Sequence, residues 1–262
     1  MQNLNFPSAT KIFTLVLIFI ISFSSCKKKE TQPAQTTNTG GGGTTGGSTP
    51  IPSNATQFYG LFRSGVYTSI SPGLPATSYT NASAYFSNQP VVAMYPASAV
   101  TVSKVFINGD SLNYNPTQKY YMAYSQVNLA SETWSINGMN GIGSFSYTTN
   151  AITPSCGDLS MLPDSISKSS TFTLAINNIS NSSMGSLIIY DGTGSMNGYY
   201  STILNQGNNT VTVTPANLSS LATTTSGNII VVLSNKKGVY FSGKDYQFSR
   251  EYQYFKYIKI KS

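Results

Sequence analysis

Asn228-Ile229-Ile230-Val231-Val232-Leu233 is the stretch that decides the fold class of this chain. It is short, almost wholly aliphatic and rich in β-branched residues, a pattern typical of a strand buried in a sandwich core. Working outward, residues 210–214 alternate Val with Thr, and residues 257–261 alternate Tyr and Ile with Lys. This period of two favours strands with one buried face. The C-terminal half is therefore predicted to be β-structure.

Tight-turn pairs follow several of the strand candidates. Asn-Gly and Asp-Gly favour the two-residue turns that join antiparallel strands. Strand candidate 102–107 runs into Asn108-Gly109, candidate 133–136 into Asn137-Gly138, and candidate 186–190 into Asp191-Gly192. Only residues 215–221 favour a short helical turn. The sequence thus predicts an all-β fold of the β-sandwich class.

The body is predicted to divide into two parts. Pro154, Gly157 and Pro163 interrupt a stretch without periodicity between residues 150 and 164. We expect a first β-sandwich domain at 57–152 and a second, immunoglobulin-like sandwich at 163–262, each of the usual size. The second contains strand candidates at 171–176, 186–190, 199–204, 210–214, 229–233 and 238–242, followed by a long terminal segment. One larger sandwich spanning both halves is the alternative.

The composition excludes several classes of function. Charged residues make up 9% of the chain, and the net charge of +7 is concentrated near the two ends. With Arg63 and Arg250 as the only arginines, nucleic-acid binding is not expected. The chain has no histidine, so it lacks the commonest general base and metal ligand. We expect no metal and no cofactor.

The N-terminus has the layout of a secretory signal peptide at residues 1–25. Lys11 supplies a positive charge, and the apolar run 12–21 is too short to span a bilayer. Phe23-Ser24-Ser25-Cys26 resembles the lipobox of bacterial lipoproteins, and Lys27-Lys28-Lys29-Glu30 is similar to the start of many Bacteroidota-type lipoproteins. The resemblance implies that Cys26 is acylated, for example with palmitate, and anchors the protein in the outer membrane. It leaves the periplasmic or surface face open.

Residues 26–56 are predicted to form the lipidated N-terminus and a flexible linker. Their Gly/Thr/Ser/Pro-rich composition cannot offset the entropy of ordering, and residues 31–54 would reach roughly 25–30 Å. The glycine run at 40–43 lacks the G-K-[ST] ending of a phosphate loop. The body that follows resembles the immunoglobulin-like β-sandwich domains of uncharacterised surface lipoproteins.

The search for catalytic chemistry finds only weak patterns. Ser165-Ile166-Ser167-Lys168 matches S-x-x-K, as do Ser234 and Lys237, but no K-T-G accompanies them. Without histidine, a hydrolase would need two facing carboxylates. The candidates in the body are Asp110, Glu132, Asp158, Asp164, Asp191, Asp245 and Glu251. Turn formation explains several of them, so no catalytic residue is expected.

Four further features carry expectations. Asp110-Ser111-Leu112 and Asp164-Ser165-Ile166 resemble the O-glycosylation sequon of exported Bacteroidota proteins, which implies possible modification of Ser111 and Ser165. Cys156 has no partner in the mature chain and is interpreted as a small buried hydrophobe rather than a reactive thiol. Trp134 is interpreted as a core residue. The pairs Tyr120-Tyr121 and Tyr199-Tyr200 should place one ring on each face of a strand.

These observations lead to a function of binding rather than catalysis. We expect a lipid-anchored cell-envelope interaction module that binds a glycan or another envelope protein. The alternatives are a structural or assembly subunit of an envelope complex and, third, a carboxylate-only glycoside hydrolase.

Overall fold

The computed structural model describes residues 51–262, apart from residues 95, 125–126 and 195–197. The predicted signal peptide at 1–25, Cys26 and the linker up to residue 50 lie outside the described residues. Within the described ranges the fold is all-β, as predicted, with the short 3-10 helices η2 (Pro96–Ser98) and η3 (Pro215–Leu218). No helix in these ranges is both long and apolar enough to cross a bilayer.

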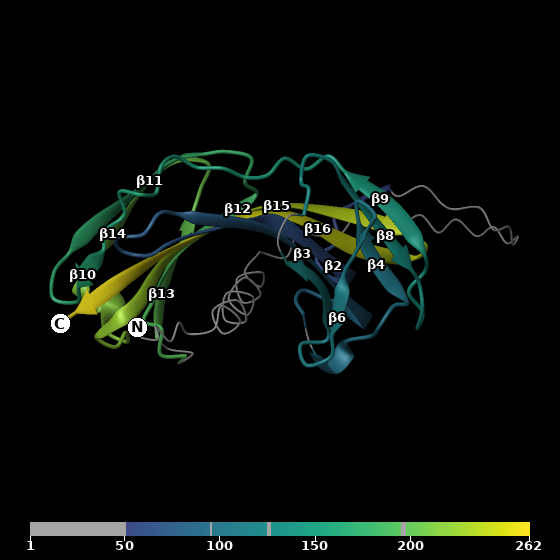
Figure 1. Cartoon of the computed structure of the whole chain (residues 1–262), viewed down its shortest axis with the longest axis horizontal. Coiled ribbons are helices and arrows are strands. Elements are labelled where there is room, and N and C mark those ends of the chain that lie inside the picture. The colour runs from purple at the N-terminus through teal and green to yellow at the C-terminus, as the bar shows by residue number, and fades with distance from the viewer. Residues whose placement is uncertain (1–50, 95, 125–126, 195–197) are drawn as a thin grey trace, which may run out of the picture.

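A single long sheet forms the frame of the molecule, and Figure 1 shows it arching across the whole width of the body. Short strand β1 (Ile51–Ser53) pairs with β15 (Thr224–Phe241), and short strand β10 (Ser165–Ser167) pairs with β16 (Lys244–Lys261). The main path runs through β13 (Tyr199–Leu204), β12 (Met184–Tyr190), β15 (Thr224–Phe241), β16 (Lys244–Lys261), β2 (Phe58–Ile70), β3 (Thr77–Val91), β7 (Tyr120–Tyr124) and β6 (Asn113–Asn115).

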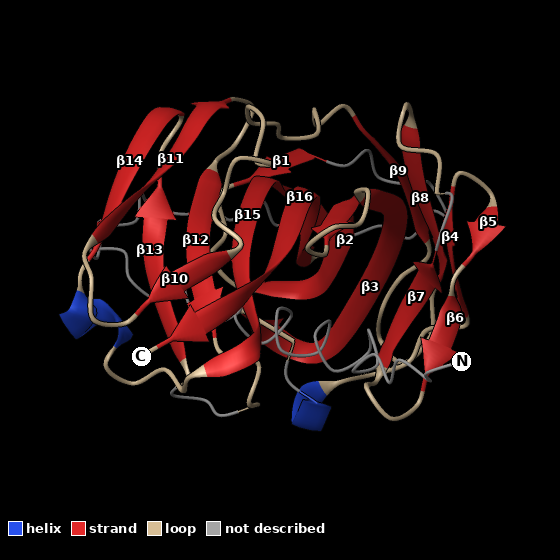
Figure 2. Cartoon of the chain, turned by 60° about the vertical axis from the view of Figure 1, so that its left-hand side comes forward, coloured by secondary structure: helices blue, strands red, loops and turns tan. Residues whose placement is uncertain are grey.

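Two small sheets cap the convex face of this central sheet at opposite ends (Figures 1 and 2). One cap consists of β11 (Phe172–Ile179) and β14 (Gly207–Val213). The other consists of β5 (Asp110–Ser111), β4 (Lys104–Ile107), β8 (Glu132–Asn137) and β9 (Phe145–Thr149). A sheet covered by a second layer is the arrangement of a β-sandwich.

Each cap closes one hydrophobic core. The β11–β14 cap packs Leu174 and Ile176 against Val231 and Ile258 of the central sheet. The β4–β8–β9 cap packs Trp134 and its neighbours against Phe62, Phe86 and Phe248. Because side chains alternate between the faces of a strand, Phe248 and Ile258 of β16 lie on the same face. One face of one strand thus serves both cores.

The central sheet crosses the boundary that we predicted between residues 152 and 163. Strand β16 pairs in parallel with β2 from Tyr246↔Gly60 to Lys256↔Ile70, and antiparallel with β15 along almost its whole length. The two predicted sandwiches at 57–152 and 163–262 therefore share their largest sheet, as in the alternative of one larger sandwich. Nor is the connecting segment a free linker, because Tyr254 Oη donates to the carbonyl of Leu159 at 3.1 Å.

The strands predicted at 229–233 and 238–242 are one strand, β15, which continues through the polar residues between them. The β15–β16 hairpin closes at Ser242 (φ 47°) and Gly243 (φ 81°), both in the left-handed region that two-residue turns require. Residues 51–53, assigned to the linker, instead form β1 on the overhanging part of β15. Pro52 is tolerated there because β1 is a short edge strand.

The turn predictions have mixed outcomes. Asn108 (φ 52°) and Gly109 (φ 90°) form the predicted tight turn between β4 and β5. The turn predicted at Asn137-Gly138 is wrong, because the positive φ angles fall at Asn140 and Gly141, between the bridged residues Met139 and Ile142. Gly138 has a different role: a Cβ there would lie 2.2 Å from the carbonyl oxygen of Ile142.

Candidate functional site

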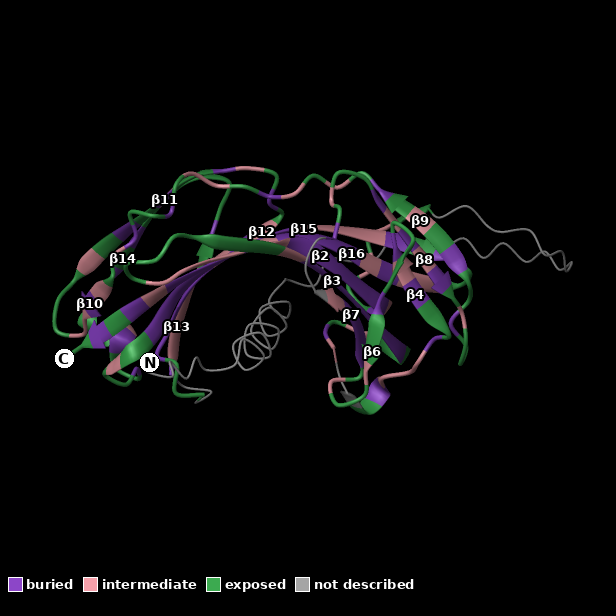
Figure 3. Cartoon of the chain, in the orientation of Figure 1, coloured by how far each residue is buried: buried purple, intermediate pink, exposed green. Residues whose placement is uncertain are grey.

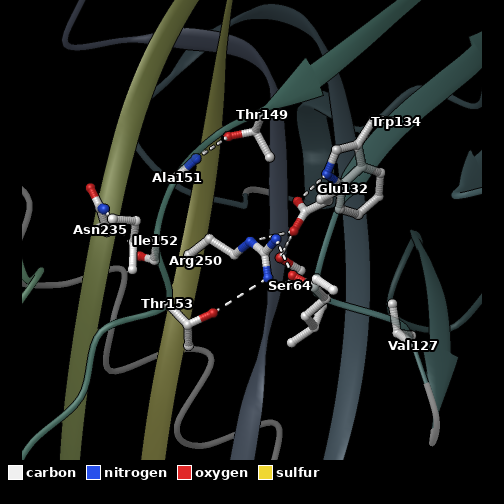
Figure 4. Close-up of polar contacts among 12 residues, drawn as sticks. Ser64, Val127, Glu132, Trp134, Thr149, Ala151, Ile152, Thr153, Asn235 and Arg250 are labelled. Carbon is white, nitrogen blue, oxygen red and sulfur yellow. Dashed lines mark hydrogen bonds and ion pairs between the residues drawn. The ribbon is translucent and has the colours of Figure 1, made fainter.

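A buried ion pair occupies the convex face of the central sheet between the two cores. Arg250 of β16 and Glu132 of β8 approach to 2.5 Å between Nε and Oε2, with side chains 3% and 2% exposed. Ser64 Oγ donates to Glu132 Oε2 at 2.6 Å, and the indole N–H of Trp134 donates to Glu132 Oε1. Figure 4 shows these side chains converging from three strands. We call Ser64, Glu132, Trp134 and Arg250 the convex seam.

The convex seam has the properties of a structural joint. Both oxygens of Glu132 are engaged by buried donors, and Arg250 Nη2 donates to the carbonyl of Leu129 at 2.7 Å. The N–H group of Arg250 Nε is close to Glu132 Oε2 but not aligned with it, so the contact is an ion pair and not a hydrogen bond. Trp134 is fully buried against Phe62, with ring centroids 5.1 Å apart, as the sequence predicted for a core residue. The convex seam therefore fastens one cap to the sheet.

A second polar group lies on the opposite, concave face of the sheet. Arg250 and Glu251 are neighbours on β16, so their side chains point to opposite faces. We call Arg63, Tyr67, Asn81, Glu251 and Gln253 the concave cluster; each is less than one-tenth exposed. They come from β2, β3 and β16, which lie side by side in Figure 2.

The carboxylate of the concave cluster is held from several sides. Gln253 Nε2 donates to Glu251 Oε2 at 2.8 Å, and Ser249 Oγ donates to Oε1 at 3.3 Å. Arg63 Nε lies 3.8 Å from Glu251 Oε1. Gln253 Nε2 also reaches the hydroxyl of Tyr67 at 3.5 Å. Both carboxylate oxygens of Glu251 are thus already engaged by side chains of its own sheet.

Three polar atoms of the concave cluster have no hydrogen-bond partner: Arg63 Nη1, Asn81 Nδ2 and Gln253 Oε1. A buried polar group without a partner costs about 1–3 kcal/mol, and more when it is charged. Such groups are rare in folded proteins and call for an explanation. Because Asn81 also makes a side-chain hydrogen bond with Tyr67, Arg63 Nη1 and Gln253 Oε1 are the two atoms of the cluster that no described partner engages.

A buried apolar cluster adjoins the concave cluster on the same face of the sheet. Tyr67 packs with Ile188 and Tyr190 of β12, Ile230 and Val232 of β15, and Phe255 of β16. We call this group the apolar concave patch. All its members belong to the central sheet, whereas the two convex cores each combine the sheet with a cap. Both described caps lie on the convex face (Figures 1 and 3), and the members of the patch are nevertheless only 2–7% exposed.

Lys236 adds a second cation to the concave face. It pairs across β15–β16 with Ser249, which in turn is opposite Arg63. Burial, and then repulsion from Arg63, lower the pKa of Lys236 to about 8, although Glu251 opposes this shift. Burial also raises the pKa of Tyr67 well above its usual value. Around the concave cluster, the charged residues of the described sheet are thus Arg63, Lys236 and Glu251.

The residues that the sequence singled out are scattered over the body. Ser111 is exposed in β5, whereas Ser165 is partly buried in β10, where it pairs with Lys259. Cys156 packs at the edge of the core under the β11–β14 cap, and burial raises the pKa of its thiol to about 11. The thiol is therefore protonated at neutral pH, which suits a packing role.

The candidate catalytic groups do not assemble. Ser234 and Lys237 lie three residues apart on β15, so their side chains point to opposite faces. Lys168 Nζ is bound to the carbonyl of Leu221. Glu132 and Glu251 are separated by the central sheet. Asp191 accepts hydrogen bonds from Thr193 in its own turn and from the backbone N–H of Ala222, which lies just before β15. In the described residues, no group of three Asp, Glu, Cys or His side chains could hold a metal ion.

The Tyr pairs behave as the period of two predicts. Tyr121 belongs to the convex core and Tyr120 to a concave cluster with Leu61 and Tyr85. Tyr199 packs against the apolar concave patch, and Tyr200 against the opposite core.

Comparison of the chain with protein-family models and with curated proteins finds no match.

Proposed function

We propose that the chain is a lipoprotein of the cell envelope whose β-body binds a partner through the concave face of its central sheet, without catalysis. The observation that supports this proposal is the concave cluster, whose buried Arg63 Nη1 and Gln253 Oε1 lack hydrogen-bond partners, beside apolar residues on the face of the sheet opposite the two described caps. A binding surface needs a few directed polar groups beside apolar area, and this face has both.

The envelope location rests on the N-terminal sequence. Two or three acyl chains on Cys26 would hold the protein at the outer membrane, since each buried CH₂ contributes about 0.8 kcal/mol. The linker would let the body reach a partner away from the headgroups. Mass spectrometry of the mature protein tests this directly. We expect an N-terminal peptide that begins at Cys26 and carries acyl chains, and an unmodified N-terminus elsewhere would contradict it.

The partner expected from the sequence is a glycan or another envelope protein. A glycan array and an envelope pulldown should be run with the wild-type protein and with Arg63→Gln. We expect binding that is lost in Arg63→Gln and retained in Thr148→Ala, an exposed hydroxyl on the outer cap. Two empty experiments, or equal binding by both variants, would contradict binding through the concave face.

The alternative of a ligand-free assembly subunit makes a different prediction. It requires copurification with one fixed complex, in constant proportion, and no dependence on Arg63.

A further inference from the structure

We infer that β13 is an assembly edge, along which a second copy of this chain adds its own β13 in antiparallel orientation and so continues the central sheet. Two strands, β12 and β15, separate β13 from β16 and the concave cluster. The inference therefore goes beyond the proposed function and does not depend on it.

The outer side of β13 has no partner strand in the described part of the chain. β13 ends the main path of the central sheet and pairs with β12 alone, in an unbroken register from Tyr199↔Tyr190 to Leu204↔Gly185. An open edge presents a row of backbone N–H and C=O groups, and proteins normally protect it with proline, charged residues, bulges or very short strands. β13 consists of six residues, Tyr-Tyr-Ser-Thr-Ile-Leu, and has none of these protections.

The opposite end of the same sheet shows the contrast. There β6 has three residues, Asn113–Asn115, and Pro116 follows it directly. The short strand β1, which pairs with the overhanging part of β15, contains Pro52. Both features limit the addition of a further strand. β13 is thus the end of the central sheet that is open to pairing.

One hydrogen bond at the start of β13 fixes the direction of its backbone groups. The N–H of Asp191 donates to the carbonyl of Gly198 at 3.0 Å, so the backbone groups of Gly198 point toward β12. This pair continues the β12–β13 register, and successive residues of a strand direct their backbone groups to alternate sides. The N–H and C=O groups of Tyr199, Ser201 and Ile203 therefore point outward, away from β12.

These three residues are complementary to a second copy of themselves. An antiparallel β13 centred on Ser201 places Ser201 opposite its own counterpart, and Tyr199 opposite Ile203 of the other copy. Each of the three pairs would exchange two backbone hydrogen bonds, about six in all. The same residues then serve both chains, as a two-fold interface requires.

The side chains along this edge also favour the pairing. Tyr199, Ser201 and Ile203 point to the same face of the sheet, where Tyr199 packs against the apolar concave patch. Ile203 is a large aliphatic residue, yet it is 71% exposed. The second copy would place Tyr199 beside it, and aromatic and β-branched side chains in directly opposite positions stabilise a strand pair. Because β13 contains this complementary pattern within its own sequence, a second copy is favoured over a foreign strand.

Disulfide cross-linking of the mature protein in liposomes tests the register. Every variant also carries Cys156→Ala, so that the introduced thiol is the one that reacts. Ser201→Cys should form a disulfide-linked dimer, since directly opposite residues have Cα atoms about 4.5–5.5 Å apart, within the reach of a disulfide. Thr202→Cys is the matched control. In this register Thr202 is opposite Tyr200 of the other copy and about 7–8 Å from its own counterpart, so it should cross-link at least about ten-fold more slowly.

Charges at the same position test the pairing without a covalent bond. Ser201→Lys and Ser201→Asp each place two like charges directly opposite one another, which destabilises a strand pair. In analytical ultracentrifugation of the mature protein in detergent, we expect the wild type to dimerise with rising concentration. Each variant alone should dimerise at least about ten-fold more weakly, and a mixture of the two should form a mixed dimer. Circular dichroism like that of the wild type confirms that the variants fold.

Several outcomes would overturn the inference. They are equal cross-linking of Ser201→Cys and Thr202→Cys, no cross-linking of either, a wild type that stays monomeric, and a Ser201→Lys variant that dimerises like the wild type. If Ser201→Cys in cells traps a different envelope protein instead of its own copy, the edge binds a foreign strand and the second copy is wrong. The Arg63→Gln experiment tests the proposed function separately, so either idea can fail while the other stands.

Discussion

Replacing Glu132 with glutamine should destabilise the fold by about 3–5 kcal/mol, because it leaves the guanidinium of Arg250 buried without its counter-charge. The structure supports the upper part of the range for buried pairs. The two side chains are 3% and 2% exposed, so water cannot replace the lost carboxylate. Glutamine would also turn an N–H group toward Arg250 or toward the hydroxyl of Ser64.

The measurement is urea unfolding followed by far-ultraviolet circular dichroism, with the fluorescence of Trp134, the only tryptophan, as a second probe. Asp164→Asn is the matched control. It removes a carboxylate 3.0 Å from Lys256 Nζ, but that side chain is 69% exposed. Lys256 is itself 6% exposed, but its Nζ also donates to the carbonyls of Ser160 and Leu162, and the carboxylate that is lost was largely solvated. The control should therefore cost about 1 kcal/mol, well below the loss in Glu132→Gln.

A double variant sharpens the argument. Glu132→Leu with Arg250→Met removes both charges, and it should be less destabilised than Glu132→Gln because no unpaired charge is left. The reasoning is refuted if the free energy of unfolding of Glu132→Gln is within about 1 kcal/mol of the wild-type value. It is also refuted if the double variant loses as much stability as the two single variants added together.

Two further predictions concern pH and domain structure. Lys236→Met should raise the free energy of unfolding near pH 7 by on the order of 2–3 kcal/mol, since the folded protein holds the pKa of this lysine at about 8 instead of 10.5. The sign follows from proton uptake, because above pH 8 the native lysine is neutral while the unfolded one stays charged. The stability of the wild type therefore rises with pH, and the advantage of Lys236→Met should vanish by about pH 10.5. An advantage that stays constant with pH would contradict this. Residues 163–262 expressed alone should not fold, because β16 would lose its parallel partner β2, and a well-dispersed amide spectrum of that fragment would disprove it.

The sequence predicts the fold class well because its strongest signals are local. The aliphatic run at 229–233, the Asn108-Gly109 turn and the placement of Tyr120 and Tyr121 on opposite faces depend only on the period of two and on turn geometry. These signals can be recognised in the sequence without knowing which strands pair.

The interruption in β15 shows why the domain organisation could not be predicted in the same way. Ser234, Asn235 and Lys236 look like a loop, yet they pair with Glu251, Arg250 and Ser249 in an unbroken ladder. Both strands become polar at the same level, where the sheet passes between its two cores. A polar stretch in a strand cannot be distinguished from a turn until its partner strand is known.

The candidate site is harder still to find, since its residues lie far apart in the chain. Arg63, Asn81 and Glu251 meet through one parallel and one antiparallel pairing. The sequence signal was an arginine and a glutamate inside apolar strands, in a chain with few charges. That signal marks both the convex seam and the concave cluster, and only the alternation along β16 separates them.

Isoleucine methyl NMR of the mature protein, during titration with the glycan or envelope protein that it captures, tests binding at the concave face most directly. Ile188 and Ile230 lie in the apolar concave patch, and their chain neighbours Ile189 and Ile229 lie in the opposite core. We predict saturable shifts of the Ile188 and Ile230 methyl signals, with Ile189 and Ile229 nearly unmoved. Equal shifts on both faces, or no shift of Ile188 and Ile230, would contradict a concave binding surface.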